Sequence, residues 1–211
     1  VFVAMAVFVS LSAFPLFAAQ RLAVVNTMNR QTYVTDPEKN TVLVIDNQER
    51  VQKTIHVGKL PIAILANPKN NKVYVANNKS DTVSVIDCYD DSVMPVRVGR
   101  SPTSIALNFK ANRLYVANSG GASVTSIDCY NNATQKIPLN FNPVSLKPVP
   151  NSNTLMVTGS QGENAIIDCQ TNTVRYNVLP RNTQITQVFT PDRQRYEEQQ
   201  RRGQQLNMFS T

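Results

Sequence analysis

The chain has 211 residues, of which 42% are hydrophobic and 17% are charged. This composition excludes global disorder and suits about one or two folded domains. The formal net charge of +7 would suit an acidic partner, an anionic membrane or a nucleic acid. The basic excess is spread thinly along the chain and no basic run is interleaved with aromatic residues, so nucleic-acid binding is not indicated.

The first segment, residues 1–19, is uncharged and consists mostly of Val, Phe, Ala and Leu. It ends in Ala18 and Ala19, and an apolar run before small residues is typical of a secretory signal peptide. The alternative is a membrane anchor, because the segment nearly reaches spanning length. Pro15 and the small residues favour the signal peptide. Either interpretation predicts a periplasmic, extracellular or cell-surface protein, with membrane contact only if the segment is retained.

A unit of about 41 residues then recurs along the chain, which is the spacing of a repeat architecture. Three landmarks share this interval. The first is Tyr33-Val34-Thr35-Asp36, Tyr74-Val75-Ala76-Asn77, Tyr115-Val116-Ala117-Asn118 and a degraded copy at Met156. The second is an Ile-Asp pair ending at Asp46, Asp87, Asp128 and Asp168, and the third is a proline at Pro61, Pro102 and Pro143.

Each unit contains four short apolar runs separated by turn-forming residues. In the second copy the runs cover residues 62–66, 73–76, 82–86 and 93–98. The run 82–86 alternates polar and apolar residues, which predicts a half-buried strand. No run has helical spacing. The sequence therefore predicts an all-β fold, a β-propeller of four-stranded antiparallel blades.

The stretch Val73 to Leu107 resembles the YVTN family of β-propeller repeats, with its Tyr-Val-Ala-Asn strand, Val-Ile-Asp strand and Val-Gly-x-x-Pro link. The resemblance covers about residues 21–189 and weakens in the fourth copy. The repeat spacing itself predicts units at about 20–60, 61–101, 102–142 and 143–183, with the first strand of a fifth copy at 185–189. Residues 190–211 are expected to form a charged helix or tail.

Members of this family typically have more blades than four. Three possibilities therefore stay open at this stage: a small closed ring, an open array completed by self-association, or a piece of a longer protein.

The chain offers little for catalysis or metal binding. Cys88, Cys129 and Cys169 follow the repeated aspartate, where the first copy has Asn47, so they lie on different blades and we expect neither disulfides nor a metal site. The aspartates are expected to form turns. His56 is the only histidine and no nucleophile motif accompanies it. We expect no catalytic residue and no cofactor.

The loops between second and third strands should share one edge of the propeller with the links between blades. This predicted rim is the candidate surface for a ligand or partner, although solvated loop tips would look the same. Its residues are Asp36, Lys39, Lys59, Asn77, Asn78, Lys79, Arg100, Asn118 and Ser119.

We therefore expect an extracytoplasmic, non-catalytic scaffold that binds a protein or ligand at the cell envelope. One alternative is an enzyme or enzyme-associated propeller, lactonase-like or quinoprotein-associated, which would need clustered Glu, Asn and Asp around the channel. The other is a propeller that binds single-stranded nucleic acid, which would bind with a steep dependence on salt.

Overall fold

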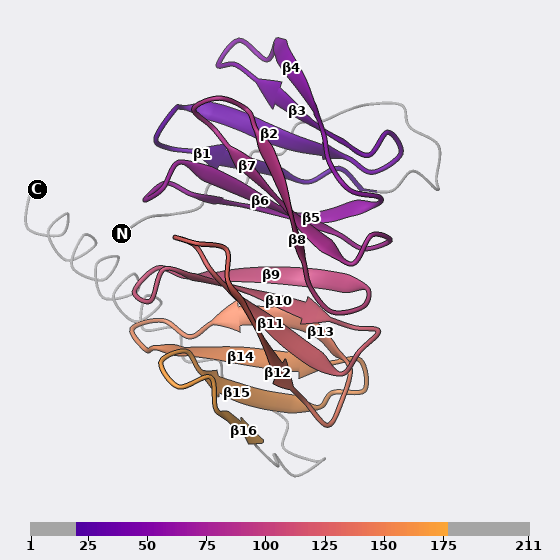
Figure 1. Cartoon of the computed structure of the whole chain (residues 1–211), viewed down its shortest axis with the longest axis vertical. Helices are drawn as coiled ribbons and strands as arrows, with labels where there is room; N and C mark the ends of the chain where they lie inside the picture. Colours follow the sequence, from indigo (N-terminus) through magenta and orange to yellow (C-terminus); the bar gives the residue numbers. More distant parts are fainter. Residues whose placement is uncertain (1–19, 177–211) are drawn as a thin grey trace, which may run out of the picture. The chain divides into compact units, whose positions relative to one another are not determined.

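The computed structural model describes residues 20–176. The predicted signal peptide, the fifth-copy strand and the charged tail lie outside these residues. The described part is all-β, with sixteen strands in four separate four-stranded antiparallel sheets (Figure 1). The predicted fold class is thereby confirmed. We call the sheets blades 1 to 4 in chain order.

Within each blade the strands are hydrogen-bonded in sequence order, as expected when short turns join neighbouring antiparallel strands. Blade 1 contains β1 (Ala23–Asn26), β2 (Gln31–Asp36), β3 (Thr41–Ile45) and β4 (Val51–His56). Blade 2 contains β5 (Pro61–Asn67), β6 (Lys72–Asn77), β7 (Thr82–Asp87) and β8 (Val93–Arg97). Blade 3 contains β9 (Pro102–Asn108), β10 (Arg113–Asn118), β11 (Ser123–Asp128) and β12 (Thr134–Pro138). Blade 4 contains β13 (Pro143–Pro148), β14 (Thr154–Gly159), β15 (Asn164–Asp168) and β16 (Val174–Tyr176).

Consecutive blades pack face to face, and the contacts between their first strands run in chain order from β1 to β5, β9 and β13. We call the side that meets the next blade the forward face and the opposite side the back face. In blade 2 the forward face carries Tyr74 and Val83, which pack with Leu114 and Val116 of blade 3. The same arrangement encloses a separate hydrophobic core at each of the three joints.

Packing on both sides explains one wrong prediction. Residues 82–86 were expected to form a half-buried strand, but Val83, Ser84, Val85 and Ile86 are all buried in β7. Alternation normally marks one wet face, whereas a central blade has a neighbour on each side. Ser84 is accommodated because its hydroxyl accepts a hydrogen bond from the side chain of Asn77 at 2.9 Å.

The turns recur as faithfully as the strands. Asn71 and Asn112 occupy equivalent turns with φ of 51° and 48°, in the left-handed region where Asn is favoured among side-chain-bearing residues. Gly99 is needed because a Cβ there would lie 2.6 Å from the side-chain carbon Cγ of Asn118. Gly58 has the same relationship to Asn77. These turns set the two edges of each blade.

Candidate binding surfaces

The joints between blades use most of the repeated polar side chains. The amide of one asparagine donates to the side-chain oxygen of an asparagine in the next blade at every joint. These pairs are Asn26 to Asn71 at 2.8 Å, Asn67 to Asn112 at 2.9 Å and Asn108 to Asn153 at 2.6 Å. We call this set the asparagine ladder. Buried amides that satisfy one another make each joint specific as well as stable.

A tyrosine and a cysteine form a second repeated contact. Tyr33 meets the Cys88 thiol, Tyr74 meets Cys129, and Tyr115 meets Cys169. Burial raises the pKa of each phenol and of each thiol, which keeps both groups neutral. The three thiols are free, and they serve as small packing groups between blades.

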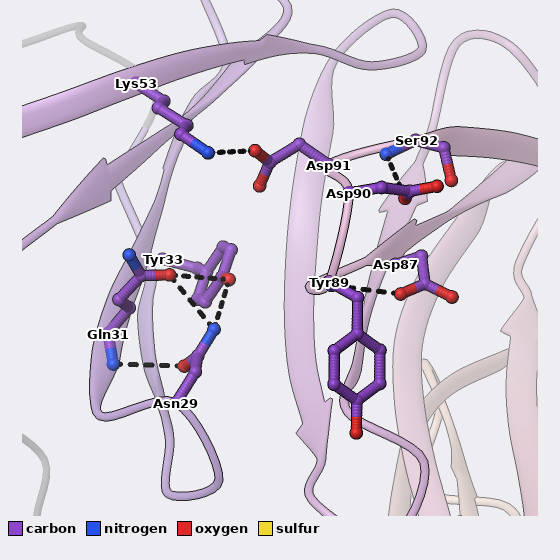
Figure 2. Close-up of polar contacts among 9 residues, drawn as sticks. All are labelled: Asn29, Gln31, Tyr33, Lys53, Asp87, Tyr89, Asp90, Asp91 and Ser92. Carbon is purple, nitrogen blue, oxygen red and sulfur yellow. Dashed lines mark hydrogen bonds and ion pairs between the residues drawn. The ribbon is translucent and has the colours of Figure 1, made fainter.

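The outer part of each joint contains a third contact, between a residue of the fourth strand of one blade and a turn residue of the next blade. Its position is the same at all three joints, but the residue types differ. Lys53 of blade 1 forms an ion pair with Asp91 of blade 2 (Figure 2). At the next joint the side-chain amide of Asn132 donates to the sulfur of Met94 at 3.0 Å. At the third joint Asn172 donates to Gln135 at 2.7 Å.

The repeated aspartates form turns, as the sequence predicts. A side-chain oxygen of Asp87 accepts the backbone N–H of Tyr89 at 3.0 Å (Figure 2), and that of Asp128 accepts Tyr130 at 2.9 Å. The backbone N–H of Arg50, with further hydrogen bonds, holds the pKa of Asp46 below its usual value. The carboxylates are therefore committed to separate turns and do not converge on a shared site.

Five of the nine predicted rim residues are engaged in the fold. Asp36 is buried against Arg21, with 2.6 Å between their charged atoms. Asn77 and Asn118 are buried, and each donates to two hydroxyls of the following strand. Asn78 donates to the carbonyl of Pro102, and Ser119 to that of Ser101. The rim side chains that remain exposed are the cations Lys39, Lys59, Lys79 and Arg100.

Three of these cations lie around the β6–β7 turn of blade 2 and the two links that flank it. The backbone N–H of Lys79 donates to the carbonyl of Lys59 at 3.1 Å, which joins the β6–β7 turn to the preceding link. The same turn reaches the following link, because Asp81 accepts the N–H of Ser101 beside Arg100 at 2.8 Å. Within residues 20–176, none of the three cations forms an ion pair. We call Lys59, Lys79 and Arg100 the basic rim.

The opposite edge of the blades exposes two tyrosines that the sequence analysis did not single out. Tyr89 and Tyr130 are 75% and 79% exposed, at equivalent turns of blades 2 and 3. The Tyr89 ring points away from the Lys53–Asp91 contact (Figure 2). The signal was present in the sequence, since both tyrosines directly follow a repeated Asp-Cys pair. A turn residue kept aromatic in two copies is not explained by packing.

Residues 20–176 contain no group of three His, Cys, Asp or Glu side chains that could hold a metal ion. The same residues contain no helix long and apolar enough to cross a membrane. What the described surface offers beyond the fold is a set of cations on one edge and exposed tyrosines on the other.

The fold places this chain among the β-propellers, and solved propellers resemble it closely in structure. Virginiamycin B lyase from Staphylococcus aureus aligns with a TM-score of 0.67 and 13% identity, over 80% of this chain and 59% of the lyase. Kuenenia stuttgartiensis hydrazine synthase aligns with a TM-score of 0.65 and 21% identity, over 74% and 48%. The WD40 repeats of RRP9 align with a TM-score of 0.62 and 9% identity, over 73% and 49%.

This chain therefore spans about half the length of the structures it matches. At such identities the similarity shows the fold alone, and propellers include both enzymes and non-catalytic scaffolds. No protein-family model and no curated protein matches the sequence. The resemblance to the YVTN repeat accordingly stays a prediction, while membership of the β-propeller fold is shown.

Proposed function

We propose that this chain is a non-catalytic binding scaffold of the cell envelope that holds an acidic protein partner on its basic rim. The proposal is carried by one observation: the repeated polar residues are used by the fold, whereas Lys59, Lys79 and Arg100 are exposed and form no ion pair within the described residues. Cations held on hydrogen-bonded loops attract a complementary acidic surface and fix its orientation.

The distribution of aromatic residues favours a protein over a single-stranded nucleic acid. Proteins that bind single strands combine cations with aromatic rings in one groove. Here the exposed rings of Tyr89 and Tyr130 lie on the edge opposite the basic rim. Asp90 and Asp91 follow Tyr89 directly, and carboxylates at that place would repel phosphates.

The experiment compares two triple charge reversals with the same net charge. One carries Lys59→Glu, Lys79→Glu and Arg100→Glu on the basic rim. The other carries Lys110→Glu, Lys136→Glu and Lys147→Glu, which are exposed residues outside the rim. Binding of fluorescent poly-glutamate, the acidic probe, is measured by anisotropy. We expect the rim reversal to weaken binding by about tenfold or more and the control by about twofold.

Equal losses in the two variants would mean that only net charge matters, and the proposal would then fail. A clear preference of the wild-type protein for oligothymidylate over poly-glutamate would instead assign the nucleic-acid alternative. The envelope location is tested separately by cell fractionation. Recovery of the protein in the cytosolic fraction would contradict that part of the proposal.

A further inference from the structure

Two blade faces have no neighbouring blade within the described chain: the back face of blade 1 and the forward face of blade 4. Val25 on the first of these is 41% exposed, while its equivalents Ala66 and Leu107 are buried at joints. Met156 on the second is also 41% exposed, although its equivalent Tyr115 is fully buried. Within residues 20–176, no other blade covers either face.

The open back face of blade 1 is apolar. Strand alternation and register place Val25, Val34, Leu43 and Ile45 together on it. Terminal repeats of stacked proteins normally end in a polar outer face. The back face of blade 1 is instead apolar, like the back faces of blades 2, 3 and 4, each of which packs against the forward face of the preceding blade. The forward face of another blade is therefore the surface expected to pack on blade 1.

The open forward face of blade 4 lacks the asparagine found at the other joints, and the back face of blade 1 lacks the matching asparagine. In the asparagine ladder the donor position of blade 4 holds Val149, and the acceptor position of blade 1 holds Arg30. Both asparagines of the pair are replaced. Joining the two faces would therefore leave no buried asparagine without its partner. Paired replacement is what a fourth joint between these faces requires.

The tyrosine–cysteine contact is replaced in the same way. Blade 4 has Met156 in place of tyrosine, and blade 1 has Asn47 in place of cysteine. An asparagine amide against a methionine sulfur is a contact this protein already makes, between Asn132 and Met94. Joining blade 4 to blade 1 would therefore repeat chemistry that is present at an internal joint.

The outer contact supports the same pairing and supplies opposite charges. Arg175 holds the place in blade 4 that Lys53 holds in blade 1, by its register opposite Ile166. Glu49 holds the place of Asp91, because both are left-handed turn residues whose N–H returns to the repeated aspartate carbonyl. The Lys53–Asp91 ion pair is the internal precedent for Arg175 with Glu49.

We propose that two copies of this chain join head to tail, with blade 4 of each packed on blade 1 of the other. The dimer has two identical joints and a two-fold axis, so it closes and does not propagate into a filament. It contains eight blades, which lies within the usual range of about four to eight for propellers. The binding role of the basic rim is independent of this assembly.

The test uses the full-length chain in sedimentation velocity over about a hundredfold range of concentration. We expect the wild type to reach twice the monomer mass. Glu49→Arg alone and Arg175→Glu alone should each raise the dissociation constant of the dimer by about tenfold or more, because each sets like charges at both joints. The double variant should recover the dimer.

Mixing provides the sharpest readout. In an equimolar mixture of the two single variants, one joint would set the new cation of the Glu49→Arg chain against the new carboxylate of the Arg175→Glu chain. The unaltered pair would form at the second joint. We expect this mixture to dimerise at concentrations where each variant alone is monomeric. The Lys53→Glu variant is the control, since its partner lies in the same chain and its mass should not change.

A wild type that stays monomeric at every concentration would overturn the proposal, as would single variants that dimerise like the wild type. Failure of the mixture to dimerise when both singles are monomeric would also overturn it, because any other pairing of faces predicts that result. Circular dichroism of each variant confirms that blade structure is retained.

Discussion

The phenol oxygen of Tyr115 in blade 3 lies 3.1 Å from the backbone carbonyl oxygen of Cys169 in blade 4, 54 residues further along the chain. The same phenol oxygen lies 3.0 Å from the side-chain oxygen of Asn172. The hydroxyl of one tyrosine in blade 3 therefore contacts two residues of the same turn in blade 4.

Replacing Tyr115 by Phe removes this hydroxyl and leaves the ring in place. The buried carbonyl of Cys169 then loses a donor, so we expect the free energy of unfolding to fall by about 1–2 kcal/mol. Urea denaturation followed by circular dichroism measures the change. Tyr130→Phe is the matched control, because the Tyr130 side chain is exposed and its loss of hydroxyl should leave stability unchanged.

Adding one methyl group at Gly99 should be costly. Its Cβ would lie 2.6 Å from Cγ of the buried Asn118, which is fixed by hydrogen bonds to Ser123 and Thr125. We expect Gly99→Ala to destabilise the protein by about 1–3 kcal/mol. Gly121→Ala is the comparison, since its nearest contact would be 3.6 Å. A similar cost for both substitutions in thermal melts would contradict this account.

Ala122 adopts φ of 39° at a turn position that is Asn40 in blade 1 and Asp81 in blade 2. The side chain of Asp81 accepts the N–H of Ser101, a hydrogen bond that alanine cannot make. Ala122→Asn should relieve the left-handed backbone and restore this bond, which stabilises by about 1 kcal/mol. Asp81→Ala should lose a similar amount, and the two variants compared by urea denaturation check one another.

The three thiols should differ in reactivity toward dithionitrobenzoate at about pH 8. Burial raises the pKa of all three, but Cys88 is only half-buried whereas Cys129 and Cys169 are almost completely covered. We expect Cys88 to react first and the other two only as the protein unfolds. Serine variants of each cysteine assign the phases, and early reaction of Cys129 would refute the ordering.

Stability should fall on acidification through the turn aspartates. Backbone N–H groups, of Arg50 for Asp46 and of Gln170 for Asp168, hold the pKa of each carboxyl below its usual value. A lowered folded-state pKa contributes stability above the unfolded-state pKa of about 4 and loses it as the pH drops through the folded-state value. We expect Asp46→Asn with Asp168→Asn to flatten the decline of Tm below about pH 4.

Much of the fold could be predicted because the same strand and turn pattern recurs in several copies of the repeat. Tyr33, Tyr74 and Tyr115 recur at one interval and mark one strand of each blade, so an error in one copy is corrected by the others. The turn role of Asp87 and Asp128 followed from the same recurrence and is confirmed by their hydrogen bonds.

The candidate site was harder to predict because alternation does not reveal what covers a face. Asn77 and Asn118 look like loop residues in sequence, yet the links at Gly58 and Gly99 lie against their side chains and the fold uses both amides. Tyr89 and Tyr130 show the opposite outcome. Aromatic residues suggest a buried core position, but these two side chains are exposed to solvent. Both outcomes depend on which parts of the folded chain cover a side chain, and the alternation of polar and apolar residues does not contain that information.

The asparagine ladder has a consequence for how such a gene can change its length. Each internal joint pairs residues 45 positions apart, so every central blade supplies one donor and one acceptor. Duplicating or deleting one whole central unit moves both together and leaves every remaining amide paired. A change by any length other than a whole repeat breaks this spacing and orphans a buried amide. Unequal crossing-over in register is thus the route by which blade number can vary without a stability penalty at the ladder.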